Sequence, residues 1–209
     1  MTFATANAEP AQTTVPQVRV FVGLKIAPEI ATELTRLAAP LKKLPVRLVE
    51  PTDIHLTLVP PWKEASPSET VNKLARVAHG FGAFQLSFQH LGYGPQPKRP
   101  RLLWADCAAN DEITALRAAL LQAYGQTDER PFQPHVTLAR IRGNGAAIAR
   151  KHPIDVPLAL TQRVESVELF QSPPPGEIGY RILASLPLGE AVGSAAILGP
   201  PGTTDVLSA

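Results

Sequence analysis

The sequence has little of what marks a protein for export, for a membrane or for a multi-cysteine metal site. Its 209 residues include one cysteine, Cys107, which excludes an internal disulfide and any zinc site built from several cysteines. The first residues have neither the basic nor the apolar segment of a signal peptide. No stretch approaches the roughly eighteen consecutive apolar residues of a membrane-spanning helix. We therefore expect a soluble cytoplasmic protein that does not associate with membranes.

An excess of charge of either sign is also missing. A net charge of +2, with 18% charged residues, lies far from the composition of a nucleic-acid coat protein or a membrane-surface binder. The hydrophobic share of 44% is enough for one well-buried core, built as one domain or two small lobes. We expect a monomer whose ordered domain spans 18–188, with a flexible segment at 1–17 and a disordered tail at 189–209.

Apolar periodicity predicts an α+β protein with mainly antiparallel strands. Pro40 is expected to shorten or kink the first helix, and Pro60 with Pro61 to end the third strand. The predicted helices are 29–44, 66–77 and 111–125, and the predicted strand regions are 18–26, 46–50, 54–59, 81–94, 101–108, 135–142, 158–172 and 180–188.

A tetrapeptide pattern occurs twice, as HLTL at 55–58 and as HVTL at 135–138. A lone His-x-Thr in a strand is usually a surface or sheet-edge pair. Two such matches among five histidines would arise by accident in on the order of a few cases in a thousand. The two copies fall in two comparable stretches of the chain, which suggests a duplicated lobe.

Each copy of the pattern presents two polar side chains on one face of a strand. His55 and Thr57 share one face, as do His135 and Thr137, while the aliphatic residues face the core. One imidazole can accept a proton while another donates one, and the hydroxyls can donate hydrogen bonds to phosphoryl oxygens. If the lobes face each other, this set fits metal-free cleavage of a phosphodiester.

Other residues near the repeats are candidates for binding a substrate or a metal. Arg140 follows the second copy and would not share a face with Thr137 in a regular strand, but it could hold a phosphate from the strand end. Trp62 and Phe21 are candidates for stacking on a base, with core packing as the alternative. The two histidines with Asp53 or Glu50 could hold a metal, but their spacing matches no zinc signature.

These residues give the chain a resemblance to the 2H phosphoesterase superfamily, which is named for its two His-x-Thr motifs. It most resembles the bacterial RNA 2′,3′-cyclic phosphodiesterases, also called 2′-5′ RNA ligases. The similarity extends from RVFVGL through IHLTL, RPRLLW and RPFQPHVTLAR to VELFQS and GYRILASLPL. The paired motifs together with RPF-x-PHVTLAR are specific, whereas the other segments are weak alone.

The resemblance implies a bilobal α+β fold, with two mainly antiparallel sheets and flanking helices around a central groove. It implies no metal or cofactor, and RNA ends or cyclic-phosphate nucleotides as substrates. On this pattern His55 is the proton donor, His135 the proton acceptor, and Thr57, Thr137 and Arg140 contact the phosphate.

The sequence departs from the family pattern at two places near the first motif, and the same residues also fit several rival functions. Leu48 stands where many members have tryptophan, and Pro60-Pro61-Trp62 replaces Phe-Leu-Gly, so the rim of the groove beside the first motif differs from the family pattern. The rivals are cyclic phosphates on small nucleotides or on ADP-ribose, 2′-5′ ligation as the reverse reaction, and a binding module for RNA ends without turnover.

Overall fold

A computed structural model describes residues 17–189. Of the expected flexible segment 1–17 and tail 189–209, residues 17 and 189 are described and the rest lie outside the described residues. The backbone of Gly189 forms an isolated bridge with Gly82. In the described part no helix is long and apolar enough to cross a membrane.

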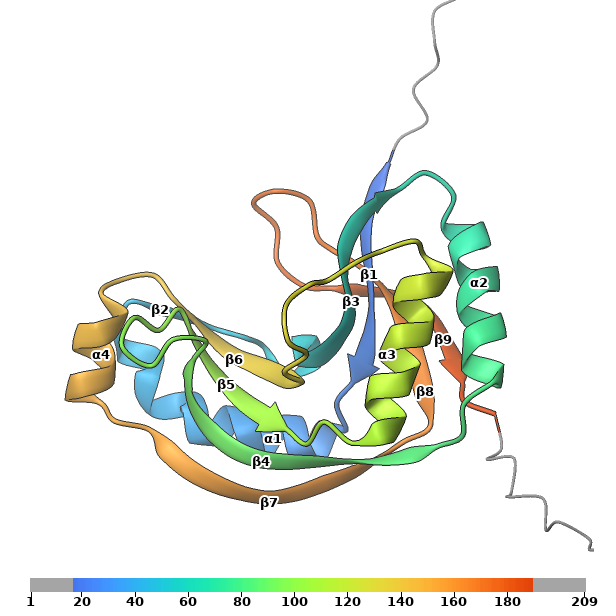
Figure 1. Cartoon of the computed structure of the whole chain (residues 1–209). Coiled ribbons are helices and arrows are strands. Elements are labelled where there is room, and N and C mark those ends of the chain that lie inside the picture. The colour runs from blue at the N-terminus through green and yellow to red at the C-terminus, as the bar shows by residue number, and fades with distance from the viewer. Residues whose placement is uncertain (1–16, 190–209) are drawn as a thin grey trace, which may run out of the picture.

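Strands and helices alternate along the chain largely as predicted (Figure 1). The strands are β1 (Val18–Lys25), β2 (Val46–Leu48), β3 (His55–Glu64), β4 (Phe84–Gly94), β5 (Leu102–Cys107), β6 (His135–Ile141), β7 (Asp155–Val164), β8 (Ser166–Gln171) and β9 (Arg181–Pro187). The helices are α1 (Pro28–Ala38), α2 (Pro67–His79), α3 (Asp111–Ala123) and α4 (Gly145–Lys151), with short 3-10 turns η1 (Ala39–Lys43) and η2 (Pro51–Asp53).

The sheet has the same arrangement on either side of its centre. Its order is β7-β4-β5-β6-β3-β1-β8-β9, every pairing is antiparallel, and β2 pairs with the outer end of β6. The α+β class with mainly antiparallel pairing is therefore confirmed. The expected two sheets are joined, because β3 and β6 pair at Leu56 and Val136 and make one hydrogen-bonded sheet of two four-strand halves.

Two helices each pack against the half of the sheet opposite to the strand that precedes them. The helix α1 follows β1 but contacts β6, and α3 follows β5 but contacts β3 (Figure 1). In α3 the side chain of Asn110 caps the helix by accepting a hydrogen bond from the Ile113 amide at 3.0 Å. Ile113, Leu116 and Leu120 form its buried face. Burial of these apolar faces holds the two halves of the sheet together.

Prolines act as predicted in one place and not in another. Pro40 ends α1, and the chain continues as the 3-10 turn η1. The prediction that Pro60 and Pro61 end β3 is wrong, because the strand continues to Glu64. At this irregular site Val59 pairs with Val22 and Trp62 with Val20, so the two prolines are not needed as ladder donors.

The helix α4 was not predicted. Its seven residues, GAAIARK, are too few to establish an apolar period, and it buries Ile148 with Gly145. Gly145 is required by close packing, since a Cβ atom there would lie 2.0 Å from the Pro100 carbonyl oxygen.

Candidate active site

The two repeated motifs lie side by side where the halves of the sheet meet. Leu56 of β3 is paired with Val136 of β6, and both are fully buried. The flanking histidine and threonine of each motif are half-buried and line the same groove. The alternation predicted from the sequence therefore brings His55, Thr57, His135 and Thr137 together on one face of one sheet.

Each motif is followed by a β-bulge at the same position. On β3, Thr57 pairs with Gly23 and Val59 with Val22, so Leu58 is the extra residue. On β6 the corresponding extra residue is Leu138, between the pairs Thr137 with Trp104 and Ala139 with Leu103. In both strands two consecutive residues are buried at the bulge, whereas a regular strand would alternate.

The second bulge explains how Arg140 reaches the groove. In a regular strand Arg140 and Thr137 would point to opposite faces, but one extra residue reverses the alternation. Arg140 accordingly lines the groove together with His55 and Thr57. The position equivalent to Arg140 after the first motif is Pro60, so only one of the two motifs supplies a cation.

Both catalytic candidates are oriented by the same backbone contact. The Nδ1–H of His55 donates to the carbonyl oxygen of Asp53 at 2.7 Å, and that of His135 donates to the carbonyl oxygen of Gln133 at 2.8 Å. A carbonyl oxygen can only accept, so the proton of each neutral ring resides on Nδ1. The Nε2 atom of each ring is therefore left for chemistry in the groove.

Aromatic rings surround His55. Its ring centroid lies 4.8 Å from that of Phe21, 5.4 Å from that of Phe170 and 4.7 Å from that of Tyr180, whose edge faces it. This burial is the main reason that the pKa of His55 is lowered, and the nearby charge of Arg140 lowers it further. The hydrogen bond to the Asp53 carbonyl acts on the pKa in the opposite direction.

A carboxylate accompanies His135. Trp104 packs on its ring at a centroid distance of 4.3 Å, and Asp106 is its direct partner on β5. Burial again lowers the pKa, while the hydrogen bond to Gln133 and the charge of Asp106 act to raise it. Burial raises the pKa of Asp106 itself, and the Nδ1 atom of His90 lies 3.8 Å from its Oδ2.

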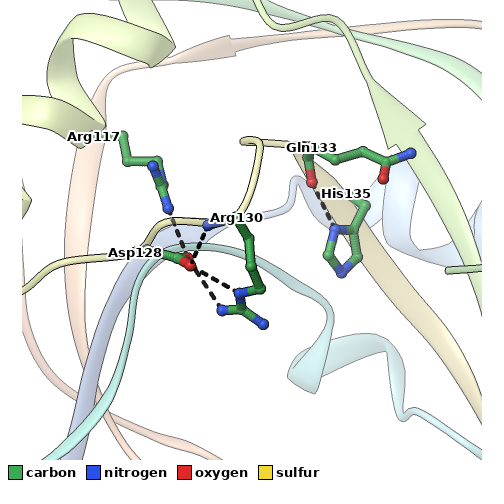
Figure 2. Close-up of polar contacts among 5 residues, drawn as sticks. All are labelled: Arg117, Asp128, Arg130, Gln133 and His135. Atoms are coloured by element: carbon green, nitrogen blue, oxygen red, sulfur yellow. Dashed lines mark hydrogen bonds and ion pairs between the residues drawn. The ribbon is translucent and has the colours of Figure 1, made fainter.

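A charged cluster fixes the segment that leads into the second motif (Figure 2). Arg117 of α3 donates to the carboxylate of Asp128 at 2.8 Å, and Arg130 donates to the same carboxylate at 2.8 Å. The guanidinium of Arg117 also lies 4.6 Å from the ring centroid of Phe132. These contacts anchor the turn whose Gln133 carbonyl orients His135.

The groove has two overlapping parts with different linings. The first, of about 340 Å³, contains both histidines and both threonines, and we call it the apolar half because it alone includes Leu48, Val49, Leu102 and Ile178. Its lining also includes the charged residues Arg47, Glu50, Asp53, Arg140 and Glu177. The second, of about 480 Å³, contains His55 and Thr57 with Arg19, Arg47, Arg140 and Ser172, and we call it the arginine half. Tyr180 lines both, and its backbone amide donates a hydrogen bond to the Asp53 carboxylate at 3.0 Å.

Two predicted binding residues do not have the expected position. Trp62 packs on Tyr124 at a centroid distance of 5.0 Å, donates to Glu64 at 3.1 Å and is absent from the lining of the groove. Phe21 borders the arginine half but is 1% exposed beneath His55, so its ring has no free face for a base. The base-stacking predictions for Trp62 and Phe21 are therefore wrong.

Four residues of the site were not predicted: Arg19, Arg47, Asp106 and Tyr180. Arg47 stands close before the first motif and Tyr180 follows a proline-glycine loop, but neither position has a motif that would distinguish it from a surface residue. The residues described in the structure contain no group of three or more His, Cys, Asp or Glu side chains arranged to hold a metal ion.

Comparisons with known proteins find a matching family model and named relatives. Residues 28–172 match the model of the 2′-5′ RNA ligase superfamily. A Bacillus subtilis protein named RNA 2′,3′-cyclic phosphodiesterase is 30% identical over 139 residues, which cover 60% of this chain and 73% of the relative. An Archaeoglobus fulgidus protein of the same name is 25% identical over 138 residues, covering 63% of this chain and 77% of the relative.

Two crystal structures share the fold. A protein of Thermus thermophilus superimposes with a TM-score of 0.68 at 23% identity, covering 83% of this chain and 99% of that one. Escherichia coli LigT complexed with NADP+ gives a TM-score of 0.66 at 22% identity, covering 84% of this chain and 100% of that one. At these identities the two structures support the fold alone.

Proposed function

The chain belongs to the 2′-5′ RNA ligase superfamily, and from this premise we propose that it hydrolyses RNA 2′,3′-cyclic phosphate ends to 2′-phosphates. One observation carries the proposal. Two histidines with the same backbone-fixed orientation and two threonines line one groove at the junction of the sheet halves. Opening a cyclic phosphodiester requires a base for the water, an acid for the leaving oxygen, and hydrogen-bond donors for the phosphoryl oxygens. Two imidazoles and two hydroxyls supply these groups.

The proposed reaction is a single displacement at phosphorus. The Nε2 atom of neutral His135 takes a proton from water as the water oxygen bonds to phosphorus. The bond from phosphorus to the 3′-oxygen breaks, and Nε2 of protonated His55 gives its proton to that oxygen. The product has a 2′-phosphate and a 3′-hydroxyl, and the two histidines have exchanged protonation states.

The remaining side chains stabilise negative charge on the phosphoryl oxygens. The hydroxyls of Thr57 and Thr137 donate hydrogen bonds, and the Arg140 guanidinium supplies a charge-assisted bond. The lowered pKa of His55 disfavours its protonated form in the free protein. A bound phosphate anion counteracts this, because a negative charge close to an imidazole raises its pKa.

The rival functions differ in how they use the same site. Ligation would open the same cyclic phosphate with a 5′-hydroxyl of a second RNA in place of water, and it is disfavoured because water is the abundant nucleophile. Small cyclic nucleotides would use the same four side chains. A module that only binds RNA ends would not need two imidazoles with free Nε2 atoms.

The decisive experiment is to incubate the purified protein with an RNA oligonucleotide that ends in a 2′,3′-cyclic phosphate, with EDTA present, and to follow the product by phosphorus NMR. A 2′-phosphate is the expected product. A 3′-phosphate would refute the assigned leaving group, and turnover that requires added metal would refute the two-histidine mechanism. His79→Ala, on the exposed end of α2, is the matched control for histidine loss.

A further inference from the structure

The arginine half of the groove contains more positive charge than one phosphate requires. Arg19 of β1, Arg47 of β2 and Arg140 of β6 come from three different strands and line one concavity of about 480 Å³. The proposed reaction uses one arginine, Arg140, for the phosphate that reacts. Arg19 and Arg47 are therefore not accounted for by the chemical step.

The three arginines of the arginine half are not neutralised by carboxylates, unlike four arginines elsewhere in the described residues. Arg36 pairs with Glu33, Arg117 and Arg130 with Asp128, and Arg163 with Glu165. Within residues 17–189 no carboxylate lies within ion-pair distance of Arg19, Arg47 or Arg140. Glu177 also borders the concavity but forms no ion pair with them in this range. The arginine half thus presents guanidinium groups that are free to bind an anion.

The placement of Arg47 is unfavourable for the folded protein alone. It is the direct partner of Arg140 in the antiparallel pair of β2 with β6. Like charges directly opposite each other on neighbouring strands are destabilising. An anion bound between the two side chains would remove that repulsion and form charge-assisted hydrogen bonds with both.

The position of the arginine half relative to the histidines indicates which anion it takes. His55 and Thr57 border both halves, as do Arg47 and Arg140, whereas His135 and Thr137 border the apolar half. Arg19 borders the arginine half and not the apolar half. The apolar half offers Leu48, Leu102 and Ile178 to a nucleobase. With the cyclic phosphate at the histidines, the space beyond His55 remains for the next charged group of the same nucleotide.

We propose that the arginine half is a second phosphate subsite, which binds the 5′-phosphate of the terminal nucleotide through Arg19 and Arg47. In an RNA chain this group is the phosphodiester that joins the last two nucleotides. The inference rests on the proposed function and deepens it. It makes the protein selective for the ends of RNA chains over cyclic nucleotides with a free 5′-hydroxyl.

The kinetic test compares adenosine 2′,3′-cyclic phosphate with and without a 5′-phosphate. For the wild type we expect kcat/KM to be at least about tenfold higher with the 5′-phosphate, the size of one or more charge-assisted hydrogen bonds. Arg19→Met should remove most of that preference, and Arg19→Lys should restore part of it. Arg47→Met should reduce the preference too, with some loss on both substrates because Arg47 borders both halves.

A binding test keeps the subsite separate from turnover. By calorimetry, adenosine 2′,5′-bisphosphate should bind the wild type at least about tenfold more tightly than adenosine 2′-monophosphate. In Arg19→Met the two affinities should approach each other, and in the wild type the difference should shrink with added salt. Arg36→Met, which removes an exposed arginine on α1 outside the groove, should leave both ratios unchanged.

The outcomes separate the two proposals. A wild-type protein that hydrolyses both nucleotides equally well, and binds both products equally well, would overturn the second subsite and leave the proposed reaction standing. A protein that hydrolyses neither nucleotide but still prefers the bisphosphate through Arg19 would overturn the proposed reaction and support the second subsite. An unchanged preference in both Arg19→Met and Arg47→Met would also overturn the assignment.

Discussion

His55 and His135 have the same local geometry and different surroundings. Each is the first residue of a bulged strand, each donates Nδ1–H to the carbonyl two residues earlier, and both line one groove. His55 lies among Phe21, Phe170 and Tyr180, whereas His135 has one aromatic neighbour and the carboxylate of Asp106. The strand geometry is therefore repeated, but the electrostatic surroundings are not.

This difference separates what orients each of the proposed catalytic histidines from what sets its protonation. The backbone carbonyl fixes the ring in both halves, so both Nε2 atoms are available. Burial lowers the pKa of both histidines, and the carbonyl contact acts to raise both, but the nearby carboxylates differ. The charge of Asp106 raises the pKa of His135, whereas Asp53 acts on the pKa of His55 mainly through its backbone carbonyl.

Removing either imidazole is the largest expected disruption. His55→Ala and His135→Ala should each lower kcat on a 2′,3′-cyclic end by at least about a hundredfold, since each removes one of the two proton transfers. The double variant should be little worse than the poorer single variant if the two act as one unit. Near wild-type turnover in either single variant would show that the histidine concerned carries no proton.

Removing the hydroxyls should have a smaller effect. Thr57→Val and Thr137→Val keep the shape of the strand and remove one donor each. We expect kcat to fall roughly ten- to a hundredfold for each, as for loss of a hydrogen bond to a charged group. Thr57→Ser and Thr137→Ser, which keep the hydroxyl, are the matched controls, and a serine variant as slow as its valine counterpart would contradict the hydrogen-bonding role.

The smallest effect should come from Asp106, and it distinguishes the two histidines. In Asp106→Asn the negative charge that favours protonated His135 is lost, so the pKa of His135 falls further below its usual value. If His135 is the proton acceptor, it stays neutral to lower pH. The acid limb of the kcat/KM profile then moves to lower pH.

The same profile can show that the roles are exchanged. If His135 were the donor, the lower pKa would instead move the alkaline limb to lower pH. Glu112→Gln, at the exposed start of α3, removes a carboxylate away from the groove and should move neither limb. Unchanged limbs in Asp106→Asn would show that this carboxylate does not act on His135.

Much of the site could be predicted because it depends on local alternation. The paired His-x-Thr motifs, the strands that carry them and the shortening of the first helix at Pro40 follow from side-chain period and backbone chemistry. The bulges at Leu58 and Leu138 were not predicted. Two consecutive apolar residues after each threonine were their signal, but the same pair also occurs where a strand simply ends.

Several of the wrong and missed predictions share a physical origin in the bulges and in the pairing of distant strands. A bulge reverses which side chains face the groove, so it brings Arg140 to the site, and the further irregularity at the two prolines leaves Trp62 opposite buried Val20 and away from the site. Arg47 reaches the groove through the pairing of β2 with β6, and Asp106 is placed beside His135 through the pairing of β5 with β6. Strand pairing and register between distant segments cannot be deduced from local period alone.

The contacts of α1 with β6 and of α3 with β3 bear on whether each half of the chain could fold by itself. If the chain is cut between α2 and β4, one piece has α1 without β6, and the other has α3 without β3. Each piece then exposes an apolar helix face that its own strands cannot cover, and β1 is separated from its partner β8. The sequence repeat is therefore not a repeat of independent folding units, and the groove exists only when both pieces have assembled.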